Sequence, residues 1–255
     1  MIQNIQDSQN TSKRNPASDI ERSLEYLSIG RKLLSMESSL RNDDGKVIYY
    51  PDKERNFLCF QFLSPSRMVL SEPLDDNTLP VFSATHKYKN DDHPEYVNER
   101  NKIKVMECIQ EFETKNIVEA LIAVALRRNK SIVATHVAKD SLREAFLLLE
   151  KENNTVLKVV MHPGQFSRLL LKDFHDFYHA STRERLTANL FGHLWTADIH
   201  VTTSIPEKTI LLTGCRSMTG FFAHHMKVTD GPTVAVEYEF AAGIYDDMSA
   251  VLEIL

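Results

Sequence analysis

One stretch of the chain, residues 94–129, restricts the fold more than any other. After Pro94 it contains neither glycine nor proline, and a proline at its start suits the first turn of a helix. Apolar residues recur in it at helical spacing, which predicts a single helix of up to about 34 residues, roughly 50 Å long. We interpret this helix as the spine of a large core, with its charged residues on a solvated face. The mostly apolar stripe consists of Ile103, Met106, Ile109, Phe112, Asn116, Ala120 and Val124.

The segment before this helix, residues 40–89, is rich in proline. It holds four of the nine prolines of the chain, between β-favouring runs at residues 46–50, 57–63 and 68–70. Proline confines strands to edges or short pieces, so we expect an irregular, extended hairpin outside any core sheet. Its aromatic side chains would then be exposed in a monomer and covered by another subunit. The alternative, a small β subdomain packed on its own chain, has equal weight. The candidates for subunit contact are Tyr49, Tyr50, Lys53, Arg55, Phe57, Phe60, Phe62 and Met68.

The N-terminal residues divide into an arm and a helix. Residues 1–18 are polar and carry too little apolar surface to offset the entropy of ordering them. Ser18 and Glu21 stand at capping-box spacing before leucines at near-helical intervals. We therefore expect a helix over residues 19–38, weakened at Gly30.

Beyond residue 130 the pattern becomes α/β. Short apolar or alternating runs predict strands at residues 131–136, 156–161, 198–205, 209–213, 234–240 and 249–255. Three start signals predict helices between them. A capping box at Ser141 opens a helix through Leu149, Pro163 opens another, and a box at Ser181 precedes Leu186 and Leu190.

Composition excludes several classes of protein. With 35 acidic and 30 basic residues the chain is mildly acidic, so we expect no broad basic face that reads nucleic acid. No apolar run approaches the length of a membrane span, and the first residues do not resemble a signal peptide. The three cysteines are far apart and are expected as reduced thiols. The eight glycines show no phosphate-loop spacing.

Histidines provide the sharpest metal-like pattern. His175 and His179, at i and i+4, would share one zinc ion if they lay on a helix. No third ligand stands at a telling distance, and ten histidines produce such a pair easily by chance. A second pair, His224 and His225, lies among apolar residues and is interpreted as packed or as a pH-sensitive interface. We expect no catalytic residue, no cofactor and no bound metal, and hence no enzyme.

Two later segments carry a family resemblance. The strand at residues 159–161 leads through His162 and Pro163 into a helix, and residues 190–202 form a hydrophobic strand entry that ends in Ile199, Val201 and Thr202. Both resemble tailed-phage major capsid proteins of the Hong Kong 97-type (HK97-like) fold, although Thr196 stands where glycine is expected. The resemblance covers residues 95–255, and the remaining elements follow in the family's order.

The resemblance implies an α+β HK97-like capsid fold. Its parts would be an N-terminal arm and helix (1–39), an extended hairpin or E-loop (40–90), a peripheral domain with the spine helix (91–130 and 214–248) and an α/β axial domain (131–213 and 249–255). Some relatives cross-link a loop lysine to a neighbour's asparagine. Because the last 60 residues contain no asparagine, we expect no such bond. We also expect an unprocessed N-terminus, with a separate scaffold or none.

The implied function is a viral major capsid protein. Copies would form hexamers and pentamers of an icosahedral shell around double-stranded DNA, held without sequence-specific contact. Scaffolding, portal and decoration proteins are implied partners, no membrane is involved, and the protein would be found in the virion after assembly in the host cytoplasm. The alternatives are an encapsulin-like compartment that holds a cargo enzyme and, third, a zinc hydrolase using His175 and His179.

Overall fold

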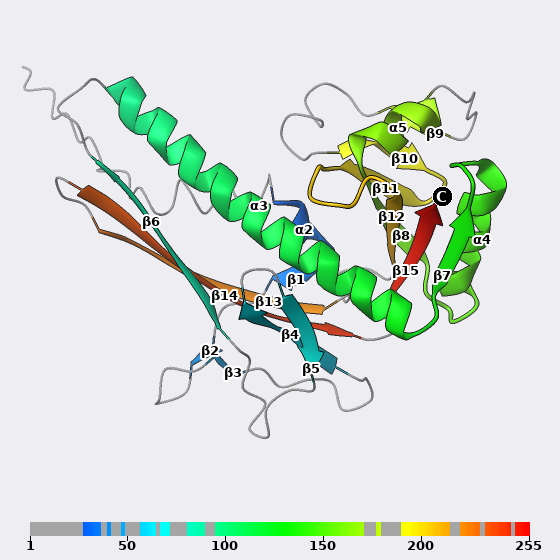
Figure 1. Cartoon of the computed structure of the whole chain (residues 1–255), viewed down its shortest axis with the longest axis horizontal. Helices are drawn as coiled ribbons and strands as arrows, with labels where there is room; N and C mark the ends of the chain where they lie inside the picture. The colour runs from blue at the N-terminus through cyan, green and yellow to red at the C-terminus, as the bar shows by residue number, and fades with distance from the viewer. Residues whose placement is uncertain are drawn as a thin grey trace, which may run out of the picture.

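The computed structural model describes residues 28–36, 40–41, 47–48, 57–64, 67–71, 81–89, 95–170, 177–179, 190–214, 220–229, 233–245 and 248–255. In these residues one long helix, α3 (Glu95–Arg127), runs diagonally past two sheets (Figure 1). A six-stranded sheet lies along its length, and a seven-stranded sheet lies beside its C-terminal half. The helix therefore contributes to a core that joins both sheets.

The 33-residue length of α3 confirms the spine helix expected over residues 94–129. Burial differs between its two halves. In the first half Val105 and Ile109 are buried, whereas in the second half Ile117, Val118 and Leu121 are fully buried. The second half lies between the two sheets, so it loses solvent on more than one side.

The six-stranded sheet consists of β1 (Ser35–Met36), β4 (Phe57–Ser64), β5 (Arg67–Ser71), β6 (Phe82–Lys89), β13 (Gly220–Thr229) and β14 (Thr233–Tyr245). The order is β1-β13-β14-β4-β5, and β6 also pairs with β14. Along β14 the side chains of Val236, Tyr238 and Phe240 are buried, while Glu237 between them is exposed. This alternation confirms the strand expected at residues 234–240, with its apolar face in the core shared with α3.

The proline-rich segment departs from expectation. Strands β4 and β6 both pair with β14, with Cys59 opposite Gly243 and Lys87 opposite Ala235. Leu58, Cys59 and Phe60 are at most 2% exposed. The expectation of a hairpin outside the core sheet was therefore wrong for these strands, although β4 and β5 do form an antiparallel pair. Two further pieces, β2 (Leu40–Arg41) and β3 (Val47–Ile48), pair with each other.

The seven-stranded sheet has the order β7-β15-β12-β8-β11-β10-β9. Its strands are β7 (Ser131–Ala134), β8 (Val156–Met161), β9 (Phe177–His179), β10 (Leu190–Leu194), β11 (Ala197–Val201), β12 (Thr209–Gly214) and β15 (Ser249–Ile254). Helices α4 (Lys139–Glu150) and α5 (Pro163–Leu170) add Phe146 and Phe166 to its core. The helix expected at Pro163 and the strand expected at residues 156–161 are confirmed.

Other helix boundaries were wrong. Helix α4 begins two residues before Ser141, whose hydroxyl accepts a hydrogen bond from the backbone N–H of Ala138 at 3.0 Å. Ser141 is thus the third helical residue and not the N-cap. Leu190 lies in β10 and not in a helix. Of the helix expected over residues 19–38, the described part is α2 (Ile29–Leu33), and the chain is already extended at Leu34.

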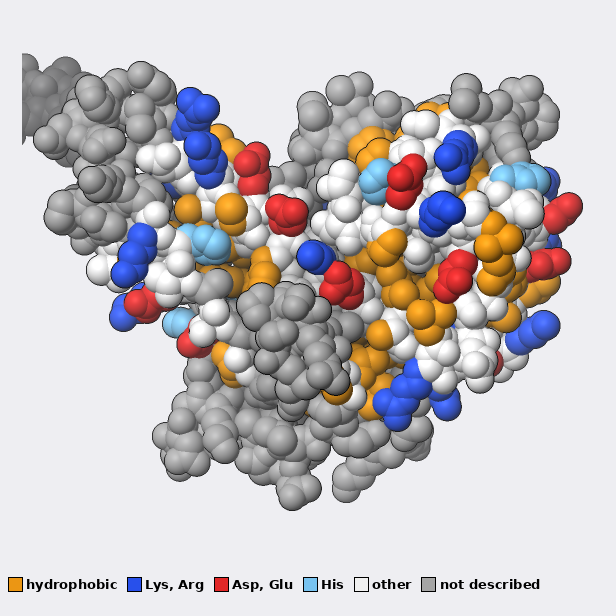
Figure 2. Space-filling view, in the orientation of Figure 1, with side chains coloured by type: hydrophobic (Ala, Val, Ile, Leu, Met, Phe, Trp, Pro, Cys, Tyr) orange, Lys and Arg blue, Asp and Glu red, His pale blue; other side chains and the backbone are white. Residues whose placement is uncertain are grey.

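The face of the molecule seen in Figure 2 shows no dominant charge among the described residues. On the face seen in Figure 2, basic and acidic side chains are interspersed and apolar side chains lie between them. Within the described ranges, no helix is both long enough and apolar enough to cross a bilayer. Cys59 and Cys108 form no disulfide bond within the part of the chain that the structure describes.

Candidate functional site

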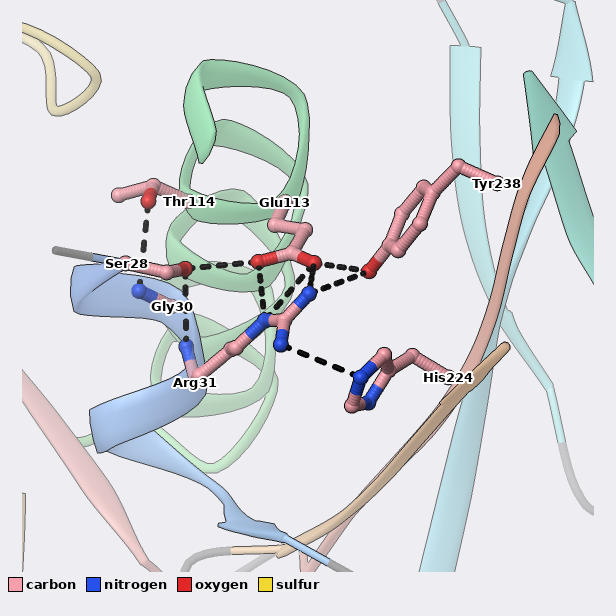
Figure 3. A network of polar contacts seen from close by, with 7 residues as sticks. All are labelled: Ser28, Gly30, Arg31, Glu113, Thr114, His224 and Tyr238. Carbon is pink, nitrogen blue, oxygen red and sulfur yellow. Dashed lines mark hydrogen bonds and ion pairs between the residues drawn. The ribbon is translucent and has the colours of Figure 1, made fainter. Parts of the chain in front are cut away.

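A cluster of polar side chains lies in the core between α2, α3 and the six-stranded sheet (Figure 3). Its centre is an ion pair between Arg31 of α2 and Glu113 of α3, whose side chains are 1% and 0% exposed. Ser28, Tyr238 and His224 surround the pair. A buried charge is tolerated only when it is paired and hydrogen-bonded. The hydrogen bonds made by each charged group therefore decide whether the core tolerates this pair.

The Glu113 carboxylate accepts hydrogen bonds from three residues. Arg31 approaches it with two nitrogens: Nη2 lies 2.6 Å from Oε1 and Nε lies 2.9 Å from Oε2. Ser28 Oγ donates to Oε2 at 2.7 Å, and the Tyr238 hydroxyl donates to Oε1. Such a two-pronged arginine contact is among the stronger pairings in proteins. The carboxylate thus links α2, α3 and β14 in one network.

Burial and the Glu113 charge act in opposite directions on the pKa of Arg31 and in the same direction on the pKa of Tyr238. Burial alone would lower the pKa of Arg31, but the nearby Glu113 carboxylate outweighs it and raises that pKa above its ordinary value. The pKa of Tyr238 is also raised, first by burial and then by Glu113. Both groups therefore keep their protons over the physiological range, and the tyrosine remains a donor to the carboxylate.

His224 of β13 completes the network on its other side. Its Nε2 lies 3.3 Å from Arg31 Nη1, and its ring stacks on that of Phe222 with centroids 5.9 Å apart. The guanidinium carbon of Arg31 also lies 5.5 Å from the centre of the Phe222 ring, within the range of a cation–π contact. Burial, followed by the charges of Arg31 and His225, lowers the pKa of His224 to about 4.

Local sequence explains how α2 enters this position. Ser28 caps the helix, because its hydroxyl accepts from the backbone N–H of Arg31. Gly30 then allows α2 to touch α3: a Cβ there would lie 2.9 Å from Ile117 Cδ1 and 3.0 Å from Thr114 Cα. The Gly30 N–H donates to the Thr114 hydroxyl at 3.3 Å. Glycine at this position therefore permits a contact that brings Arg31 within reach of Glu113.

Sequence reasoning missed this cluster. The charged residues of the spine helix were expected on a solvated face, which is wrong for Glu113. One signal was present: Glu113 follows Ile109 by four residues and precedes Ile117 by four, so it lies within the apolar stripe. His224 was expected to be packed or pH-sensitive, and its packing is confirmed, because it is partly buried against Phe222.

The proposed zinc pair loses its geometric basis. His179 lies in strand β9, whereas sharing a metal at i and i+4 requires a helix. His175 lies outside the described residues. Among the residues that the structure describes, no group of three or more His, Cys, Asp and Glu side chains is placed to hold a metal ion.

The candidate contact residues have different positions. Phe60 is fully buried by its own chain, so the expectation that it is exposed in a monomer was wrong. The backbones of Phe57 and Phe62 lie in β4 and that of Met68 lies in β5. Four candidates lie outside the described residues, namely Tyr49, Tyr50, Lys53 and Arg55.

No protein-family model and no curated protein matches the sequence. Solved structures do match it. A phage-related protein from Bordetella bronchiseptica RB50 aligns with a TM-score of 0.56 at 10% identity, over 92% of this chain and 94% of that one. The capsid structure of cyanophage P-SCSP1u aligns with a TM-score of 0.51 at 10% identity, over 89% of this chain and 88% of that one. The holo-SrpI encapsulin complex from Synechococcus elongatus aligns with a TM-score of 0.50 at 11% identity, over 90% of this chain and 89% of that one.

These likenesses extend over about nine tenths of each chain. The chain therefore has the α+β Hong Kong 97-type fold, as the segments at residues 159–170 and 190–202 led us to expect. Because only about one residue in ten is identical, the likeness shows the fold alone. A fold can carry more than one function.

Proposed function

We propose that this chain is the major capsid protein of a tailed phage. Copies assemble into hexamers and pentamers that close an icosahedral shell around double-stranded DNA. The observation that carries the proposal is the likeness to a cyanophage capsid structure over 89% of this chain and 88% of that one. Because the likeness spans both chains, the whole chain and not an isolated module is suited to the shell.

The proposal also assigns each part of the chain to a part of the capsid subunit. Residues 1–39 serve as arm and helix, residues 40–90 as the E-loop, residues 91–130 and 214–248 as the peripheral domain, and residues 131–213 and 249–255 as the axial domain. The strands of residues 57–64 and 82–89 anchor the E-loop region to β14. Contacts with neighbours therefore fall on the parts of that region outside the chain's own core.

Surface charge supports the proposal for the shell interior. The net charge of −5 suits a wall that encloses DNA without holding it tightly. DNA is then a content of the shell and not a sequence-specific ligand. Scaffolding, portal and decoration proteins are further partners, and the protein acts as a building block of the virion after assembly in the host cytoplasm. We propose no catalytic activity for it.

The contact surface is proposed without Phe60, because that side chain is already buried. Tyr49 and Tyr50 remain its leading members. The double variant Tyr49→Ser/Tyr50→Ser is expected to give folded, soluble subunits that fail to close shells, because the surface offered to the neighbour loses two aromatic rings. Val133→Ser serves as the control, because it removes an apolar side chain that is 56% exposed and lies outside the E-loop. Normal shells from the double variant would remove these two tyrosines from the contact surface.

An encapsulin-like compartment is the second candidate, favoured by the likeness to the encapsulin complex of Synechococcus elongatus. Purification of particles from the native source separates the two candidates. Genome-length DNA inside the particles supports the capsid, whereas an enclosed protein without DNA supports the compartment. Recovery of the protein only as free subunits would count against both.

A further inference from the structure

The segment that carries Arg31 is held on all sides by the rest of the chain. Residues 28–31, 33 and 34 are buried, and β1 continues the segment by pairing in parallel with Phe221 and Phe222 of β13. Polar contacts from this segment reach α3, β13 and β14. The contacts that hold this segment therefore depend on the protonation of the residues around Arg31.

The contact between Arg31 and His224 works in one charge state only. A guanidinium has N–H donors and no acceptor. At 3.3 Å from Arg31 Nη1, His224 Nε2 must therefore act as the acceptor, which requires a neutral ring that carries its proton on Nδ1. Protonation of Nε2 would place two donors against each other and would add a second positive charge beside Arg31.

We propose that the contact between Arg31 and His224 is an acid-sensitive latch, which holds residues 28–36 against the spine helix and the six-stranded sheet and opens when His224 is protonated. Opening releases this segment locally and leaves the seven-stranded sheet folded. Lys158 of β8 donates a hydrogen bond to the Lys32 carbonyl, so the seven-stranded sheet contacts this segment, but its strands pair among themselves and with no strand of the segment.

The charged and titratable groups around His224 set the pH at which the latch opens. Arg31 faces it from α2, Glu113 and Tyr238 complete the network from α3 and β14, and His225 follows it on β13. Burial, followed by the neighbouring Arg31 and His225, lowers the pKa of His224 to about 4. The folded state thus resists protonation, so the latch is closed at neutral pH and its stability is lost as the pH falls from about 6.5 towards 4.

Hydrogen–deuterium exchange of the full chain tests this proposal at about pH 7, 5.5 and 4, with rates corrected for the intrinsic effect of pH. Peptides covering residues 28–36 are expected to lose at least about tenfold in protection near pH 4. Peptides covering β12 and β15 are expected to keep theirs. Equal loss in both regions, or no loss in residues 28–36, would overturn the proposal.

His224→Gln identifies the responsible group, because the glutamine oxygen can accept from Arg31 but does not titrate. This variant is expected to keep residues 28–36 protected at pH 4. His225→Gln is the matched control and should still open in acid. If His224→Gln opens as the wild type does, the titrating group is another member of the network and the latch is refuted. If it does not fold, the local or uniform pattern of exchange in the wild type still decides the matter.

Discussion

Glu113 Oε1 lies 2.6 Å from Arg31 Nη2, although the two residues are 82 positions apart in the sequence and come from different helices. Both side chains are buried, so neither charge can be satisfied by water if the other is removed. This contact links the N-terminal segment to the spine helix, together with the hydrogen bonds from Ser28 and Gly30, and Tyr238 extends the link to the sheet.

Glu113→Ala should destabilise the fold strongly. Loss of one member of a buried ion pair leaves the other charge unpaired, which typically costs about 3–5 kcal/mol. The free energy of unfolding, measured in urea, is expected to fall by about this amount. The double variant Arg31→Met/Glu113→Leu should recover most of the loss, since it leaves no buried charge behind. If both variants are equally unstable, packing and not charge accounts for the effect.

Gly30→Ala should loosen the contact between α2 and α3. The added methyl would lie 3.0 Å from Thr114 Cα, a backbone atom that cannot move aside alone. Overpacking of this kind costs about 1–3 kcal/mol. Gly164→Ala is the matched control, because its nearest neighbour is the mobile carboxylate of Glu207 at 3.2 Å. That control should change thermal stability little, and a larger loss there than at Gly30 would contradict the prediction.

The lowered pKa of Lys32 predicts that the free energy of unfolding rises in alkaline solution. Burial and the charge of Lys158 lower its pKa to about 8. The unfolded chain, with an ordinary lysine pKa near 10.4, therefore binds more protons between about pH 8 and 10.4, and the free energy of unfolding rises across that window. Lys32→Met should be more stable than the wild type at pH 7 and should show a flatter rise, measured by urea unfolding at several pH values.

The exposed Lys151 provides the control for this experiment. Lys151→Met should leave the slope between pH 8 and 10.4 as it is in the wild type. An identical slope in the wild type and in Lys32→Met would show that Lys32 is not the group responsible.

Sequence patterns predicted the elements whose signals are local. The spine helix follows from residues 94–129 alone, and β8 follows from one apolar run. The burial of Phe60 was missed because it depends on pairing with β14, which begins at Thr233, far along the chain. The start of α4 was missed because Ser141 binds the backbone from the third helical position, a role similar to that of an N-cap.

The candidate site was less predictable than the fold. Glu113 interrupts an apolar stripe, which signals a buried charge, but nothing local identifies Arg31 as its partner. The pairing depends on Gly30, which lets two helices meet, and a weakened helix was the only effect expected of this glycine. Long-range geometry of this kind has no periodic signature in one sequence.

Electron microscopy of the expressed full-length protein tests the central claim most directly. The capsid proposal predicts closed icosahedral shells, built from hexamers and pentamers, under at least one assembly condition with or without co-expressed partners. Only small, discrete oligomers under every condition would contradict it.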